Sequence, residues 1–408
     1  MTFSQYQTAL SALEPQTQIV AMAPQRLPFQ PSVFAEFLDS GWMLTLDSDR
    51  ILLGWGKMTS CLTAAVASSF ANTSNGPIGA SVTTCAFFAP DFYLETGNSA
   101  WRQTPFWDIV DRGIFASMVL AAVDANVNDI GERFHWLGPE LEDFSEAFSE
   151  IQRGFTFRGL KKAVPVVYET AVAELSSLRV AQILKSLSAQ PRQLYIYGFW
   201  SQEHREGMIG ATPEVLFSQK PGKLVETVAL AGTISKMAGD DAALRLMQDP
   251  KERIEHQIVV EDIQNQLSLI GEVAVGRTAV LELPTLYHLK TRLQSRPQKA
   301  QNFAELTQLL HPTPALGLAP RALGFSEMKR WDHSPLRGRF GAPFGGYYRE
   351  TPSAELSQHC LVAIRNIQWQ KSDVLLGSGC GIVPESRLEN EWDELKLKRD
   401  SVKRMLGI

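Results

Sequence analysis

Cysteine is scarce in this 408-residue sequence. The cysteines show no CxxC spacing, and they are Cys61, Cys85, Cys360 and Cys380. A disulfide framework or a zinc centre needs a recurring cysteine pattern or a cluster of cysteine and histidine, and the sequence has neither. We therefore interpret these residues as buried or unreactive thiols.

The sequence also lacks a long apolar run, a leader-like beginning and a basic run. No stretch stays apolar over the roughly 20 residues that a membrane helix needs, and the first residues contain neither a basic nor an apolar leader segment. The formal net charge is −5, and nucleic-acid phosphates need a cationic surface. We therefore expect a cytoplasmic protein, monomeric, with no membrane and no nucleic-acid partner.

Hydrophobic residues make up 44% of the chain and charged residues 20%, which is typical of a soluble globular protein with a large core. The first 150 residues contain mainly structural signals. Apolar runs at 42–46 and 50–56 flank a turn at 47–49 and predict a hairpin, and a further strand is expected at 80–88 after a loop at 72–76. Apolar residues at helical spacing predict a helix over 141–151.

Residues 377–398 combine two features that favour a binding site. Gly377, Gly379 and Gly381 alternate with small residues directly after an apolar run. Because glycine has no Cβ, the backbone N–H groups there are open to a ligand. A helix then follows, on which Glu391, Glu394 and Lys398 lie on one face.

The helix after the glycines carries a pair of carboxylates. Ser386 is a suitable N-cap residue, and Glu389 completes a capping-box pattern. Glu391 and Glu394 are spaced i,i+3 and so lie on the same face. An alternative is that Glu394 and Lys398 form an ordinary solvated i,i+4 ion pair.

A second helix with a carboxylate pair is predicted to begin after Asp249. Pro250 suits the first helical position, and Glu252 and Glu255 are again spaced i,i+3. A capping box alone could explain Glu252. The predicted buried side of this helix consists of Ile254, Ile258, Ile263, Leu267 and Ile270. Oxygen ligands on two separate helices are typical of Mg²⁺, so the four glutamates are candidate magnesium ligands.

Three further residues are unusual in their surroundings. Lys162 precedes an apolar strand-like run, and burying a lysine there is costly unless it is paired. The alternative is that Lys162 lies at a strand edge and its side chain reaches solvent. Strands are predicted at 194–200, 208–219 and 223–233, and Pro213 inside the second predicts a bulge or a sheet edge that re-aims Glu214. Arg365 lies on an apolar strand and needs an anion, either a ligand or a structural carboxylate.

Eight ordered motifs resemble the family of chorismate-using enzymes, which includes isochorismate, salicylate, anthranilate and aminodeoxychorismate synthases. They are GATPEVL (210–216), LAGT (230–233), KERIEH (251–256), TLYHLKT (285–291), HPTPAL (311–316), AIR (363–365), GCGIVPES (379–386) and EWDELKLK (391–398). The resemblance covers the chain from about residue 157 to its end. HPTPA and the position of Lys162 resemble isochorismate synthases, and Ala231 stands where an amine-adding relative has a nucleophilic lysine.

The resemblance implies an α/β (α+β) fold, with one large domain over residues 1–408. Two packed, mostly antiparallel sheets are expected, with helices on the outside, a scaffold half at 1–150 and a catalytic half at 151–408. The implied activity is Mg²⁺-dependent conversion of chorismate to isochorismate, for a menaquinone or a siderophore pathway. Water would add at C2 with Lys162 as base, while Glu214 would protonate the departing C4 hydroxyl.

The implied site extends to substrate and metal ligands. The expected substrate-binding residues are Gly232, Thr233, His288, Ala315, Arg365, Gly379, Gly381 and Lys398. Glu255 and Glu394 are expected to bind Mg²⁺, with Glu252 and Glu391 as supporting holders. His288 could instead be a core histidine. Two other functions stay open: a salicylate synthase that also eliminates pyruvate, and a chorismate-binding protein without chemistry, because the segment after Lys162 departs from the family pattern.

Overall fold

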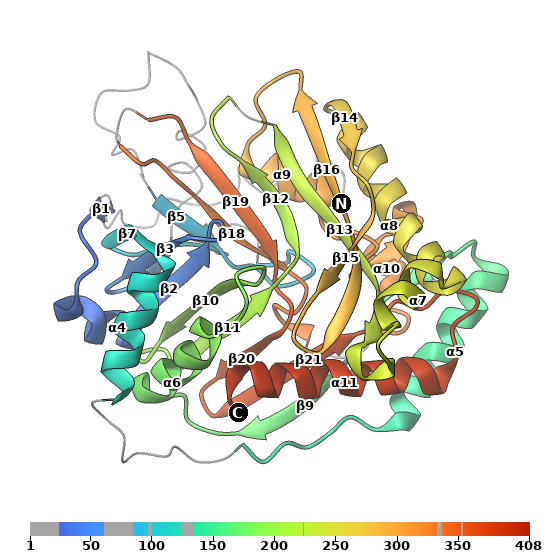
Figure 1. Ribbon diagram of the computed structural model, residues 1–408, viewed down its shortest axis with the longest axis horizontal. Helices are drawn as coiled ribbons and strands as arrows, with labels where there is room; N and C mark the ends of the chain where they lie inside the picture. The colour runs from blue at the N-terminus through green and yellow to red at the C-terminus, as the bar shows by residue number, and fades with distance from the viewer. Residues whose placement is uncertain are drawn as a thin grey trace, which may run out of the picture.

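Figure 1 shows the computed structural model as two sheets with helices around them. The described residues are 24–60, 85–96, 100–124, 134–222, 224–332, 337–351 and 354–408. The predicted loop at 72–76, most of the predicted strand at 80–88 and Cys61 lie outside these ranges. Within the ranges, no helix combines the length and the apolar character needed to cross a bilayer.

Two large sheets form the centre of the described structure. Sheet A has the spatial order β1 (Gln25–Arg26), β7 (Phe106–Asp111), β3 (Arg50–Trp55), β2 (Ser40–Thr45), β10 (Tyr195–Ser201), β11 (Glu206–Thr212), β20 (Asn366–Gln370), β21 (Asp373–Gly379), β9 (Val166–Val172). Sheet B has the order β14 (Gly271–Val275), β16 (Leu286–Pro297), β13 (Val225–Ser235), β12 (Val215–Gln219), β19 (Ser357–Val362), β18 (Pro343–Tyr348), β5 (Cys85–Phe88), β6 (Trp101–Gln103), β4 (Thr59–Ser60), and β15 (Ala279–Glu282) also pairs with β16. Only β1 and β7 pair in parallel among these described strands. The predicted pair of mostly antiparallel sheets is confirmed.

Helices cover the outer faces of both sheets. They are α2 (Phe34–Asp39), α4 (Arg112–Asp124), α5 (Leu141–Phe157), α6 (Ser177–Ser188), α7 (Ala242–Gln248), α8 (Pro250–Ser268), α9 (Phe303–Leu310), α10 (Gly324–Met328) and α11 (Leu388–Leu406), with 3₁₀ turns η1 (Pro31–Val33), η3 (Lys236–Ala238) and η4 (Arg321–Leu323). A short ladder joins β8 (Lys162–Ala163) to β17 (Leu318–Ala319). The helix predicted over 141–151 is α5.

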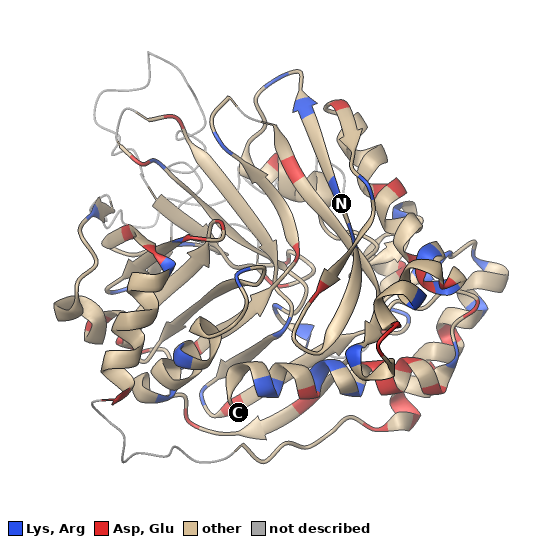
Figure 2. Ribbon diagram, in the orientation of Figure 1, with Lys and Arg blue, Asp and Glu red and all other residues tan. Residues whose placement is uncertain are grey.

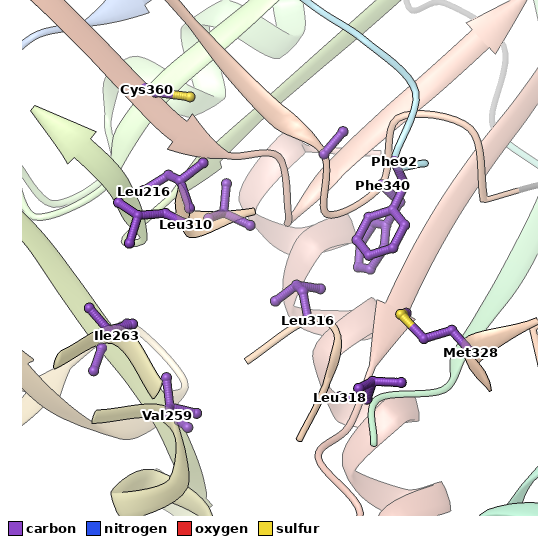
Figure 3. Close-up of a cluster of buried hydrophobic side chains, with 14 of the residues drawn as sticks. Phe92, Leu216, Val259, Ile263, Leu310, Leu316, Leu318, Met328, Phe340 and Cys360 are labelled. Atoms are coloured by element: carbon purple, nitrogen blue, oxygen red, sulfur yellow. The ribbon is translucent and has the colours of Figure 1, made fainter. Parts of the chain in front are cut away.

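Buried side chains form three layers. Between the sheets, Trp42 of sheet A stacks on Phe87 of sheet B, with ring centroids 4.8 Å apart. A second apolar layer joins sheet A to α2, α4, α6 and α11, and a third joins sheet B to α5, α8 and α9. Figure 3 shows part of the third layer, where Val259 and Ile263 of α8 lie near Leu216 of β12. The site described below lies where these layers meet.

Strand β10 shows why the sequence runs apolar without alternation. Tyr197 and Phe199 pack into the layer between the sheets, whereas Ile196 and Trp200 pack toward the helices. Both faces of the strand are therefore buried, and a strand buried on both faces needs apolar residues at every position.

Strands from residues 1–150 pair with strands from the second half of the chain. The predicted hairpin is present as β2 and β3, with the Asp47 carboxylate accepting the backbone N–H of Arg50. Strand β2 pairs with β10, and β5 pairs with β18. The strands of residues 1–150 therefore extend both sheets.

The predicted strand at 208–219 is wrong in one respect. Strand β11 ends at Thr212 in sheet A, and β12 begins in sheet B after Pro213 and Glu214. Proline has no N–H for a ladder, so the sheet breaks there and the chain crosses to the other sheet. The break leaves Glu214 between the two sheets, where the predicted bulge would only have re-aimed it.

Candidate active site

A cavity of about 80 Å³ lies where β13, β16, β21 and α11 approach one another. Ten predicted site residues line it, namely Glu214, Gly232, Thr233, Glu255, His288, Ala315, Arg365, Gly379, Gly381 and Lys398. Lys162, Glu252, Glu391 and Glu394 lie outside this wall. Larger hollows of about 710 and 700 Å³ lie beside β9, but they do not include the predicted residues.

Glu214 is the one cavity residue at the crossing between the sheets. Its side chain is 3% exposed. Burial raises the pKa of Glu214 to about 7, although the positive charges of Lys162 and Arg365 act in the opposite direction. A carboxyl with a pKa near neutrality can carry a proton to a leaving group.

Arg365, His288 and Thr233 form a hydrogen-bonded chain along the wall. Arg365 Nη2 lies 2.6 Å from His288 Nε2, and His288 Nδ1 lies 3.1 Å from Thr233 Oγ1. Because a guanidinium only donates, Nε2 must accept, and the ring proton is on Nδ1. Burial and the charge of Arg365 hold the pKa of His288 well below its usual range. The histidine is thus neutral, and it orients the arginine.

Arg365 has no structural carboxylate partner among the described residues. Its Nη1 is buried without a hydrogen-bond partner, and burial lowers the pKa of the Arg365 guanidinium to about 10. The residue has a φ of +55°, which is uncommon for a side chain with a Cβ and costs about 1–3 kcal/mol. A strained, unpaired guanidinium at a cavity wall favours the ligand alternative over the structural one.

Lys162 is buried but lies behind the cavity wall. Its side chain is fully buried, whereas Lys161 is exposed, so the alternative of a solvent-reaching lysine applies to Lys161 alone. Lys162 Nζ donates to Pro314 O at 2.7 Å and lies 3.2 Å from Glu255 Oε1. The Lys162 nitrogen therefore faces a backbone carbonyl and a carboxylate.

Glycine at 381 is required by close packing. A Cβ on Gly381 would lie 2.1 Å from Glu255 Oε1 and 2.7 Å from Lys162 Cε. Gly232 has a φ of +79° and lies at a register shift between β13 and β16. Cys380, between Gly379 and Gly381, is buried, and it forms no disulfide.

The two helices meet through a lysine that the sequence reasoning did not single out. Lys251 Nζ lies 3.0 Å from Glu252 Oε1, 3.4 Å from Glu255 Oε2 and 3.0 Å from Glu391 Oε1. The first two glutamates are on α8 and the third is on α11. The i,i+4 spacing of Lys251 from Glu255 is visible in the sequence, but the contact of Lys251 with α11 is not.

All four predicted metal ligands act on this lysine. Burial alone would lower the pKa of Lys251, but the four carboxylates outweigh burial and raise it above its ordinary value. Burial raises the pKa of Glu391, as does the charge of Glu394. Glu391 is 2% exposed, and its Oε2 has no hydrogen-bond partner. Positive charge is thus incomplete at Glu391, whereas at Glu255 the charges of Lys162, Lys251 and Lys398 outweigh burial and lower the pKa to about 2.

Glu252 and Glu394 each have a second partner. Glu252 Oε2 accepts the backbone N–H of Thr233 at 2.7 Å, so its carboxylate binds across to β13 and the capping-box explanation is wrong. Glu394 Oε1 lies 2.6 Å from Lys398 Nζ, which also donates to Gly379 O. The predicted i,i+4 pair exists, but each side chain is only about one-fifth exposed.

Two predicted helix details are corrected. Helix α11 is preceded by Arg387 as its N-cap, with no side-chain cap, and Ser386 Oγ instead accepts Val383 N–H. On α8, Ile254 is 43% exposed although we expected it to be buried. The buried face contains Glu255 and the residues His256, Val259, Val260, Ile263 and Leu267. This rotation turns Glu255 inward.

Helix α11 is fixed to sheet A by a buried ion pair. Arg399 Nε lies 2.8 Å from Glu169 Oε1 on β9, and Arg399 also donates to Ser378. Figure 2 shows that acidic positions lie toward the start of α11 and that basic positions predominate toward its end. This contact sets where the carboxylates of α11 point.

The donor set fits Mg²⁺ in chemistry. Four carboxylates from two helices supply hard oxygen ligands, and the unpartnered Glu391 Oε2 is available to a cation. In the part of the chain that the structure describes, however, no three His, Cys, Asp or Glu side chains form a ready metal group. The carboxylates are arranged around the Lys251 ammonium.

A family model described as chorismate binding enzyme matches residues 138–407. The chain belongs to the chorismate-binding enzyme family. The match includes every residue of the site described above.

Several proteins of this family are similar in sequence. The salicylate biosynthesis isochorismate synthase of Pseudomonas aeruginosa is 30% identical over 269 residues, which cover 64% of this chain and 53% of that protein. Isochorismate synthase MenF of Bacillus subtilis is 28% identical over 237 residues, covering 56% and 48%. The chain thus spans about half the length of the curated relatives it matches.

Solved structures of chorismate-binding enzymes share the fold. DhbC from Bacillus anthracis superposes with a TM-score of 0.71 at 19% identity, covering 93% of this chain and all of that one. MenF, the menaquinone-specific isochorismate synthase from Escherichia coli, gives a TM-score of 0.69 at 18% identity, covering 99% and 98%. The similarity covers nearly the whole chain, including residues before 138, where the family match begins.

Proposed function

We propose that this protein is an isochorismate synthase. Water would add to C2 of chorismate while the C4 hydroxyl leaves as water, so the overall formula is unchanged and the enzyme is an isomerase. The observation that carries the proposal is Glu214, a buried carboxyl on the cavity wall whose pKa is raised to about 7. Such a group is still partly protonated at neutral pH and can act as the acid for the leaving hydroxyl.

The proposed base is Lys162, which takes a proton from the attacking water. It is fully buried, and its nitrogen lies at hydrogen-bond distance from Glu255 and Pro314. Lys161 is exposed and does not line the cavity. To act as a base, Lys162 must first lose its own proton and turn a free lone pair toward the water.

The substrate carboxylates have matching donors in the cavity. Arg365 offers its unpartnered Nη1, and Lys398, which also lines the cavity, offers an ammonium. His288 keeps the guanidinium oriented, and the backbone around Gly232 and Gly379 leaves room for close approach. Thr233 and Gly381 border the same space, and Ala315 completes the wall.

Mg²⁺ is the proposed cofactor. Glu255 and Glu394 would hold it, with Glu252 and Glu391 supporting. When bound, the ion would neutralise a substrate carboxylate and fix its position.

Ala231 supports the choice among branches of the family. It lines the cavity at the position where one of the two amine-adding branches has a nucleophilic lysine. A methyl group there cannot form a covalent bond to the ring, so Ala231 argues against that one branch.

The test is product analysis with the purified protein, chorismate and Mg²⁺. We expect isochorismate in the product mixture and no pyruvate. Release of pyruvate together with salicylate would replace the proposal with a salicylate synthase. The similarity to the salicylate biosynthesis isochorismate synthase of Pseudomonas aeruginosa makes this measurement necessary. Tight chorismate binding without any product would indicate a binding protein.

A further inference from the structure

Lys251 occupies the position that a divalent cation would need. Its nitrogen lies within 3.4 Å of oxygens from Glu252, Glu255 and Glu391. Mg²⁺ requires oxygen ligands at about 2.0–2.1 Å in near-octahedral geometry. An ammonium in contact with three of those oxygens fills the space between them and repels a second cation, so the two cannot be present together.

The cluster depends on this lysine as long as no metal is present. Its ammonium contacts Glu252 and Glu255 of α8 and Glu391 of α11, and without it the repulsion between these carboxylates would push the first turns of the two helices apart. Lys162 beside Glu255 and Lys398 beside Glu394 add positive charge at the edge of the cluster, but Lys251 is the cation that bridges the two helices. The unpartnered Oε2 of Glu391 shows where that compensation is incomplete.

Lys251 is also free to leave. It is the second residue of α8, and its side chain is 20% exposed, so it has a route to solvent. A lysine has a flexible four-carbon stem and a strongly hydrated head. It can therefore swing outward while the helix backbone and the carboxylates stay in place.

We propose that Lys251 is a built-in substitute cation, which keeps the four carboxylates assembled without metal and must leave when Mg²⁺ binds. The inference rests on the magnesium site of the proposed function. It predicts that Lys251 lowers the apparent affinity for Mg²⁺, because the ion binds only the fraction of molecules in which the lysine is out. It also predicts that Mg²⁺ exposes Lys251 to solvent.

The first experiment measures Mg²⁺ binding by titration calorimetry in the wild type and in Lys251→Met. We expect the variant to bind about tenfold more tightly or better, in the range of ordinary coupling between sites. Its melting temperature should be lower than that of the wild type without Mg²⁺ and should rise more when Mg²⁺ is added. Lys396→Met is the control, since that exposed lysine of α11 pairs only with Asp400 and should change neither value.

The second experiment needs no variant, in case Lys251→Met does not fold. Amine acetylation of the wild type, followed by mass spectrometry, should label Lys251 several-fold faster with saturating Mg²⁺ than without, and Lys396 equally in both. Unchanged labelling of Lys251, or equal or weaker Mg²⁺ binding by folded Lys251→Met, would overturn the inference and leave the proposed function intact. If no Mg²⁺ binds to the wild type or the variant, both the metal site and the inference fail. Metal-dependent exposure without isochorismate formation would support the inference and remove the proposed activity.

Discussion

Replacing Glu214 by glutamine should raise stability while it removes activity. Glutamine has nearly the same shape but cannot ionise or deliver a proton. The pKa of Glu214 rises from an ordinary 4.5 to about 7 in the folded protein because of burial. A rise of that size corresponds to about 3 kcal/mol of folding free energy that the carboxylate form costs.

The pH at which this cost appears follows from the sign of the shift. Between pH 4.5 and 7, the folded protein keeps a proton on Glu214 that the unfolded chain has already released. The stability of the wild type therefore falls as the pH rises through this window, and the deficit stays constant above it. Glu214→Gln escapes the deficit. Its advantage should be near zero at pH 4.5 and about 3 kcal/mol at pH 8.

Urea unfolding of both proteins at pH 5 and pH 8 measures this difference. We expect the variant to gain in midpoint at pH 8 far more than at pH 5, while turnover of chorismate falls by roughly 10²–10⁴-fold. Glu272→Gln is the control, because Glu272 is exposed on β14 and should show no such pH-dependent gain. An advantage of Glu214→Gln that is equal at the two pH values, or absent at both, would refute the buried-acid interpretation.

Three other changes test separate parts of the site. Lys162→Gln should reduce turnover by roughly 10²–10⁴-fold with unchanged far-UV circular dichroism; full turnover would remove its role as the base. Gly381→Ala should displace the Glu255 carboxylate, since the added Cβ would lie 2.1 Å from Oε1. We expect this variant to bind Mg²⁺ more weakly and to lose activity. The control Gly138→Ala, whose Cβ would meet nothing within 4 Å, should match the wild type in both measurements. Arg399→Met should lower the unfolding free energy by about 2 kcal/mol in urea titrations, because it leaves buried hydrogen-bond partners unpaired; no change would mean that the buried pair does not fix α11.

The motifs and periodic patterns predicted much of the fold and the wall of the cavity. The N-cap at Asp249 and the proline after it predicted the start of α8, and the side chain of Asp249 does accept the N–H of Glu252. Glycines at 379 and 381 predicted backbone N–H groups open to a ligand; both residues line the cavity, and a Cβ at Gly381 would have no room. These features depend on local backbone geometry, which the residue types at these positions indicate directly.

What the sequence did not predict depends on contacts between distant segments. Nothing local shows that Lys251 of α8 reaches Glu391 of α11, or that Lys162 pairs with Glu255. The sequence predicted a bulge or a sheet edge at Pro213 and not a crossing between sheets, because a proline breaks a ladder in each case and only the partner strands distinguish them. The capping-box reading of Glu252 failed for the same reason: its carboxylate binds Thr233, which is 19 residues away along the chain.

The measurement that tests the central claim most directly is turnover of chorismate in ¹⁸O-labelled water, with Mg²⁺ and with EDTA. The account predicts isochorismate that carries one ¹⁸O at C2, because the new hydroxyl comes from solvent and the C4 hydroxyl leaves as water. It also predicts no product when EDTA removes the metal. Unlabelled isochorismate, or chorismate that remains unchanged with Mg²⁺ present, would contradict it.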